Sequence, residues 1–303
     1  MGGSWKVSAV AGHAVVLAAL ATQEELVDWD PAVTLAASEA DPSDPEIWKL
    51  EAWFPREPGE ADRATIAGLF ADEAPSLTVE RLPETDWVIE SQKGLAPIRA
   101  GRFHVRTPEH APSDEPDTVN FLIPASQAFG TGQHETTSGC LAMLEVMKQR
   151  GVVVRDCADI GTGTGLLAFA ALALWPYTSV TASDIDPVCA EVVAGNAGLN
   201  NVGLGTRRGE VLVVIADGMD DALIDARAPF DLVIANILAG PLIDLAPDFA
   251  DALVPGGHLL LSGLLTSQEP QVRAACFRAG LRLAARATQG EWSILWLRRR
   301  ALR

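Results

Sequence analysis

Residues 159–165 read Asp-Ile-Gly-Thr-Gly-Thr-Gly and combine an acid with three closely spaced glycines. A probable strand at 156–160 leads into them and an apolar helical segment at 165–174 follows, so they are expected to join a strand to a helix. Glycine lets the backbone turn sharply and approach a ligand, because no Cβ stands in the way. The segment therefore predicts a cofactor loop, although a tight turn without a ligand would have the same composition.

The spacing of the glycines separates the possible cofactors. A dinucleotide-binding loop has the pattern G-x-G-x-x-G, but Leu166 occupies the place of its third glycine. No lysine follows as in a phosphate-binding loop. The pattern G-x-G-x-G, with Asp159 two residues ahead of it, is similar to the first motif of class I methyltransferases. That resemblance implies S-adenosylmethionine as the cofactor, held by the loop at Asp159, Gly161 and Gly163.

A second acid stands where the next expected strand, 180–185, ends. The carboxylate of Asp184 is placed to accept both hydroxyls of an adenosine ribose. Dinucleotide enzymes use an acid at a similar place, so this feature alone does not separate the two classes. Asp186 and Pro187 are better explained as the cap and first residue of the following helix.

A polar run at 128–137, Ala-Phe-Gly-Thr-Gly-Gln-His-Glu-Thr-Thr, is too rich in glycine and polar residues to be a strand. As a loop ahead of a helix at 138–148, it is placed to fold over a bound cofactor. The hydroxyls of Thr131 and Thr137 can then reach the methionine amino or carboxylate group. His134 is more simply explained as a hydrogen-bonded structural residue.

Asn236 ends the apolar segment 231–236, which is expected to be the fourth strand of the sheet. Ligands of doubly wound folds bind outside the carboxyl ends of the strands. Amine methyltransferases commonly carry a tetrapeptide led by Asn or Asp at this place, and Asn-Ile-Leu-Ala at 236–239 is similar to it. An asparagine there can also serve only as a helix cap, but the two other motifs favour a site.

Alternating strands and helices from residue 117 onward supply the elements that must position these residues. The pattern indicates an α/β fold, a doubly wound parallel sheet with helices on both faces. Residues 281–288 and 292–297 are expected to add an antiparallel hairpin at the end, as in the Rossmann-like fold of class I methyltransferases. The expected parallel strands are 156–160, 180–185, 211–215, 231–236 and 258–262.

Two further parts precede this catalytic domain at 117–303. Residues 1–83 follow the order βαββαβ, which is the ferredoxin-like α+β arrangement, and nothing in them looks catalytic. Residues 84–116 are rich in proline and are expected to form a linker, with some strand character at 103–105.

The chain has 303 residues and a formal net charge of −17. Its acidity disfavours direct nucleic-acid binding and suits a basic partner, although acidity also simply maintains solubility. The apolar run 10–20 is too short to span a bilayer and lacks a basic lead-in, so it is expected to be a core helix. The cysteines are scattered, which predicts no metal site and a cytoplasmic location with reduced thiols; they are Cys140, Cys157, Cys189 and Cys276.

Together these segments resemble one family, the ribosomal protein L-11 methyltransferases (PrmA), over nearly the whole chain. The resemblance is carried by 128–132 with His134 and 136–137, by 236–239 with 241–242, by 261–263 with Gln268, and by 86–88 with Pro97. The chain departs from the commonest form of the family at 123–126 and at Gln133 and Glu135. It implies that Asn236 orients the amine as the catalytic residue. The cofactor contacts that follow from the motifs and the resemblance are Phe129, Thr131, Gly132, Thr137, Asp159, Gly161, Gly163, Asp184 and Asn236.

The function implied is transfer of methyl groups from S-adenosylmethionine to lysine side chains or the N-terminal amine of ribosomal protein L-11. The protein is expected to be a monomer, with the N-terminal domain recognising the substrate. One alternative is a related protein-lysine methyltransferase acting on electron-transfer flavoprotein, against which the βαββαβ unit argues. Two others are an NAD-dependent oxidoreductase, disfavoured by Leu166, and a non-catalytic scaffold, disfavoured by the segment at Asn236.

Overall fold

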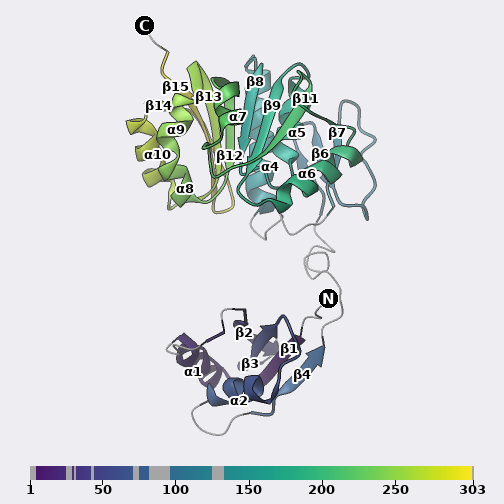
Figure 1. Cartoon of the computed structure of the whole chain (residues 1–303), viewed down its shortest axis with the longest axis vertical. Coiled ribbons are helices and arrows are strands. Elements are labelled where there is room, and N and C mark those ends of the chain that lie inside the picture. The colour runs from purple at the N-terminus through teal and green to yellow at the C-terminus, as the bar shows by residue number, and fades with distance from the viewer. Residues whose placement is uncertain are drawn as a thin grey trace. The chain divides into compact units, whose positions relative to one another are not determined.

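The structure is a computed structural model that describes residues 5–24, 29–30, 32–41, 44–70, 75–81, 96–124 and 133–301 (Figure 1). The chain divides into two compact units, Met1–Glu90 and Ser91–Arg303. Buried apolar residues of the first unit form a cluster of their own, separate from those of the second.

Within the described residues, the first unit is a four-stranded antiparallel sheet in the order β2-β3-β1-β4. The side chains of β1 alternate, so that Val7 and Ala9 are buried while Val10 is exposed. This is the ferredoxin-like arrangement that the sequence predicts. Its elements are β1 (Trp5–Gly12), α1 (His13–Glu24), β2 (Thr34–Asp41), β3 (Asp44–Phe54), α2 (Glu60–Gly68) and β4 (Thr78–Arg81).

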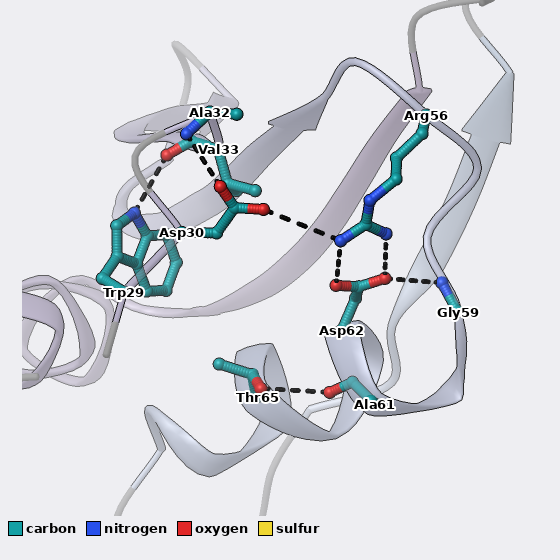
Figure 2. Close-up of polar contacts among 9 residues, drawn as sticks. All are labelled: Trp29, Asp30, Ala32, Val33, Arg56, Gly59, Ala61, Asp62 and Thr65. Atoms are coloured by element: carbon teal, nitrogen blue, oxygen red, sulfur yellow. Dashed lines mark hydrogen bonds and ion pairs between the residues drawn. The ribbon is translucent and has the colours of Figure 1, made fainter.

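An exposed arginine orders the connection between β3 and α2 (Figure 2). Arg56 donates two hydrogen bonds to the carboxylate of Asp62, at 2.5 and 2.9 Å, and its guanidinium lies 3.7 Å from Asp30. The same Asp62 carboxylate accepts the backbone N–H of Gly59 at 2.7 Å, which satisfies a donor at the start of α2. The guanidinium of Arg56 therefore links Asp30, ahead of β2, to Asp62 in the first turn of α2.

The described residues of the second unit form an eight-stranded sheet in the order β10-β11-β9-β8-β12-β13-β15-β14. Neighbouring strands run parallel from β10 to β13, and the hairpin β14–β15 adds two antiparallel strands. The predicted doubly wound sheet with a terminal hairpin is confirmed. The strands are β8 (Asp156–Ile160), β9 (Ser179–Asp184), β10 (Gly203–Leu204), β11 (Glu210–Ile215), β12 (Phe230–Asn236), β13 (Leu253–Leu265), β14 (Leu281–Gln289) and β15 (Trp292–Arg299).

Helices bury both faces of this sheet (Figure 1). Leu144, Phe169 and Val193 come from the three helices of one face, and Leu242 and Val272 come from two helices of the other. Strands covered on both sides are rich in apolar residues, as β12 and β13 show most clearly. The helices are α4 (Gln133–Gln149), α5 (Leu166–Leu174), α6 (Val188–Leu199), α7 (Ala222–Arg227), α8 (Ala239–Asp244), α9 (Ala246–Asp251) and α10 (Glu269–Arg278).

The expected linker at 84–116 differs from the structure over its second half. β5 (Ile98–Ala100) and β6 (Phe103–Arg106) lie there, and with β7 (Val119–Leu122) they make a three-stranded sheet of the second unit. Phe103 stacks on Phe121 at a centroid distance of 6.0 Å, and Phe121 contacts Phe169 of α5 at 6.5 Å. The strand character expected at 103–105 is confirmed by β6. β5 is too short to show clear periodicity, and the sequence does not reveal the aromatic contacts that hold these strands.

Within the ranges given above, no helix is long and apolar enough to cross a membrane. The same residues contain no group of three or more His, Cys, Asp or Glu side chains arranged to hold a metal ion. All four cysteines are buried thiols without a disulfide bond.

Candidate active site

The glycine loop begins where β8 ends and stops where α5 begins. Gly161, Gly163 and Gly165 have φ angles of 71°, 52° and 83°, a region in which residues with a Cβ are strained. The N–H groups of Gly161 and Thr162 both donate to the carbonyl oxygen of Ser183 in β9, at 2.8 and 2.9 Å. The loop is therefore held against the neighbouring strand by its own backbone.

Asp159 lies beneath this loop and is 1% exposed. Its Oδ2 accepts the hydroxyl of Thr162 at 2.7 Å and the backbone N–H of Ala168 at 3.0 Å. Its Oδ1 has no hydrogen-bond partner among the described residues. Burial raises the pKa of this carboxyl to about 6, because no cation compensates for the lost water. In the structure Asp159 braces the loop from below.

Asp184 lies at the end of β9, and its carboxylate links the glycine loop to the segment that leads into α6. Its Oδ2 accepts the N–H of Gly163 at 2.9 Å, and its Oδ1 accepts the N–H of Asp186 at 3.1 Å. Each carboxylate oxygen has a second lone pair left for a ligand. Asp186 in turn accepts the N–H of Val188 at 2.9 Å, which is the capping contact expected at the start of α6.

Asn236 lies at the end of β12, next to the first turn of α4. Its Nδ2 is 3.4 Å from Oγ1 of Thr136 and 3.5 Å from Oγ1 of Thr137, so both contacts are long. The Oδ1 atom is buried and has no partner in the part of the chain that the structure describes. A buried amide oxygen without a donor is costly and uncommon in folded proteins, so it marks Asn236 as a candidate site residue.

Two glycines fix the turn that follows Asn236. A Cβ on Gly161 would lie 2.2 Å from Cγ2 of Ile237, and a Cβ on Gly263 would lie 2.3 Å from the carbonyl oxygen of Ile237. Gly263 has φ 82° and sits in a bulge of β13, between the pairs Leu261–Leu295 and Leu264–Ser293. Bulges beside active sites commonly redirect a side chain. Here the bulge makes room for the Ile237 peptide.

A cavity of about 670 Å³ opens at this carboxyl edge of the sheet, where β8 and β12 are neighbours and the strand order reverses. That volume is typical of small-molecule sites. Apolar side chains cover much of its wall, including those of Ile185, Leu245 and Trp292. Among the described residues, its charged lining groups are all carboxylates, those of Asp184, Asp186 and Asp217.

The structure brings together part of the predicted site. Gly161, Gly163, Asp184 and Asn236 line the cavity. Asp159 is covered by the loop, and Thr137, which is 6% exposed, is not among the described lining residues, whereas its neighbour Thr136 is. The remaining predicted contacts lie outside the described residues; they are Phe129, Thr131 and Gly132.

Several lining residues were missed from the sequence. Ser183 and Ile185 flank Asp184, and Leu238 follows Asn236 by two positions, so proximity to a strand end was the available signal. Asp217, which follows β11, also lines the cavity. Trp292 comes from the hairpin, and only the pairing of β15 with β13 brings it to the site.

The sheet order with its reversed hairpin strand, and a cavity at the glycine loop whose described lining residues include no cation, define a class I S-adenosylmethionine-dependent methyltransferase. A bound dinucleotide would bring phosphates close to three carboxylates. The family of ribosomal protein L11 methyltransferases (PrmA) matches residues 13–300, and the chain belongs to this family.

Individual relatives agree with that assignment. The chain is 38% identical to the ribosomal protein L11 methyltransferase of Agrobacterium fabrum, over 88% of this chain and 89% of the relative. It is 40% identical to the enzyme of the same name from Sinorhizobium fredii, over 76% and 77%. A solved structure of a ribosomal protein L11 methylase from Lactobacillus delbrueckii subsp. bulgaricus matches 68% of this chain and 98% of its own, with 25% identity and a TM-score of 0.57.

The substitution Gly263→Ala tests the fixed turn. It should cost about 3 kcal/mol of stability, because the new Cβ adds a clash with Ile237 to the strain of a positive φ. Gly280→Ala is the matched control, since Gly280 has φ 89° but nothing within 4 Å of an added Cβ. It should lose about 1 kcal/mol and keep full turnover. Thermal melts and methyl-transfer rates measure both effects, and equal losses in the two variants would contradict the fixed turn.

The substitution Asp159→Asn tests the buried carboxyl. A folded-state pKa of about 6 lies above the ordinary value, so the protonated carboxyl favours folding at pH 4 and this contribution is lost as the pH rises through 6. Above pH 7, Asp159→Asn should therefore be more stable than the natural chain, by about 3 kcal/mol for a shift of two units. Near pH 4 the difference should vanish. Denaturant titrations at both pH values check this, and a gain that does not depend on pH would refute the explanation.

Proposed function

We propose that this enzyme transfers methyl groups from S-adenosylmethionine to amino groups of ribosomal protein L11, on lysine side chains, the N-terminal amine or both. The observation that carries the proposal is Asn236, a residue of the cavity wall whose Oδ1 has no hydrogen-bond donor among the described residues. An amine is a donor that fits such an oxygen. The relatives named above carry L11 in their names, which supports the same substrate.

The residues present fit the cofactor. Asp184 offers carboxylate oxygens to the ribose hydroxyls, and the glycine loop allows the backbone close to the methionine portion. The cationic sulfonium supplies a methyl group that is already activated. Three lining carboxylates favour a cation in this cavity and oppose a phosphate. The role of each named residue is a proposal, and Asp159 is proposed to act indirectly, by holding the glycine loop in place.

Asn236 has the properties of an orienting group. Its amide does not ionise, so it cannot take the proton of the attacking amine, but its oxygen can accept an N–H and direct the lone pair. The amine must arrive neutral, against ordinary pKa values of about 10.4 for lysine and about 8 for an N-terminal amine. Burial against an apolar wall that includes Leu238 and Trp292 lowers the pKa of the bound amine, which favours the neutral form.

We further propose that the N-terminal unit recognises the substrate protein. Residues 1–90 hold 18 acidic and 5 basic residues, against 22 and 18 in residues 91–303, so most of the net negative charge belongs to this unit. A basic protein is the partner that such a surface attracts. A monomeric state, the absence of direct nucleic-acid contact and a cytoplasmic location stay predictions of the sequence.

The direct test is transfer of labelled methyl groups from S-adenosylmethionine into purified ribosomal proteins, followed by mass spectrometry of the labelled band. The label should enter L11 at amino groups. Purified electron-transfer flavoprotein is assayed in parallel, and label in that protein with none in L11 would favour the alternative substrate and contradict the proposal.

Two substitutions separate cofactor binding from amine orientation. Asn236→Ala should keep the Kd for S-adenosylmethionine within a few-fold, and it should lower kcat about 100-fold, because the amine loses its directing oxygen. Asp184→Ala should raise that Kd at least about tenfold, because the ribose loses its acceptor and the loop loses the bond to Gly163. Calorimetry and turnover with L11 measure both. Unchanged turnover in Asn236→Ala would remove that residue from the mechanism.

A further inference from the structure

The outer face of α1 in the N-terminal unit is apolar. From residue 14 to residue 21 the helix reads Ala-Val-Val-Leu-Ala-Ala-Leu-Ala, without a polar side chain. Val16 and Ala19 are fully buried against the sheet, yet Val15 is 48% exposed and Leu17 is 44% exposed. Ala14 and Ala18 are also exposed. A helix that is apolar all round is normally covered on more than one side.

The second helix of the same unit, α2, has the polar outer face that is usual for a helix exposed to solvent. α2 buries Ile66 in the same core as α1, and its outer face carries Glu60, Arg63 and Thr65, all exposed. Both helices pack on one face of the sheet, so their surroundings are comparable. The apolar outer face is thus a property of α1 and not of the fold.

The opposite face of the sheet is occupied by charges at its centre. Glu51 of β3 lies 3.0 Å from Lys6 and 3.1 Å from Lys49, and Lys6 is 3.5 Å from Glu80. These groups satisfy one another across β1, β3 and β4. The helix face of α1 has no such polar network in the described residues, which makes it the stronger candidate for a docking surface.

The charge of the unit decides between the possible occupants. With 18 acidic and 5 basic residues in 1–90, a second copy of the chain would bring the same excess of negative charge against it. An anionic lipid surface is repelled for the same reason. A basic protein with apolar side chains is attracted by the charge and can cover Val15 and Leu17.

We infer that the outer face of α1, formed by Ala14, Val15, Leu17 and Ala18, is where apolar side chains of the basic substrate protein dock. This inference rests on the proposed function, because the partner it names is L11. The surface lies outside the cofactor cavity, all of whose described lining residues belong to the second unit. It should therefore change the apparent affinity for the protein substrate without changing cofactor binding.

The test uses the full-length chain with the double substitution Val15→Gln and Leu17→Gln, and Ala64→Gln on the outer face of α2 as the matched control. All the changes are neutral, and all lie at exposed helix positions. KM for purified L11 should rise about tenfold in the α1 variant, which corresponds to losing burial of two half-exposed aliphatic side chains. The kcat at saturating L11, the Kd for S-adenosylmethionine and the KM of the control should stay at the natural values.

A second variant guards against loss of folding. Leu17→Ala keeps a strong helix former, and it should raise KM about threefold with the natural melting temperature. An unchanged KM in both α1 variants, with L11 methylated by the natural chain, overturns the docking surface alone. A natural chain that does not methylate L11 overturns the proposed function. A dimer seen by sedimentation in the natural chain and lost in the double variant would assign α1 to a second copy instead.

Discussion

The positions of the glycine loop and of Asn236 depend on one packing constraint: Ile237 is packed between Gly161 and Gly263. Its side chain takes the space that a Cβ on Gly161 would fill, and its backbone takes the space of a Cβ on Gly263. Three neighbouring strands, β8, β12 and β13, are thereby locked together at their carboxyl ends. Asn236 is the residue just before this lock, so a rigid contact sets where its amide stands. The glycine loop and Asn236 are consequently coupled through Ile237.

Two buried carboxyl groups of the second unit show how hydrogen-bond and ion-pair partners set the pKa of a buried acid. Glu269 is 4% exposed, but it accepts the hydroxyl of Ser293 at 2.7 Å and an ion pair from Arg286 at 2.7 Å, which together hold its pKa below the ordinary value despite burial. Asp159 is as deeply buried and has only neutral donors, so its pKa is raised. The first stabilises the hairpin that carries Trp292, and the second places a destabilising charge beneath the cofactor loop, as functional sites often do.

Sequence patterns were sufficient wherever function depends on local spacing. The glycine loop, Asp184 and Asn236 stand at the ends of strands that periodicity identifies, so their meeting at one edge follows from a parallel sheet. The direction of the Asp159 side chain could not be predicted, since a side chain at a strand end can point into the loop or into the cavity. The position of Trp292 at the cavity depends on the register of β15 against β13, which the bulge at Gly263 shifts. The strands of the region expected as linker depend on aromatic contacts with α5, which no local pattern records.

The carboxylates of the cavity wall have a consequence for the end of each catalytic cycle. Asp184, Asp186 and Asp217 attract a cation, and the described residues supply no basic side chain in the wall to neutralise them. Methyl transfer removes the positive charge from the sulfur, so these carboxylates would attract the spent cofactor less strongly than the fresh one. The charge of the wall would thus distinguish the fresh from the spent cofactor at the sulfur, where the two differ by one positive charge.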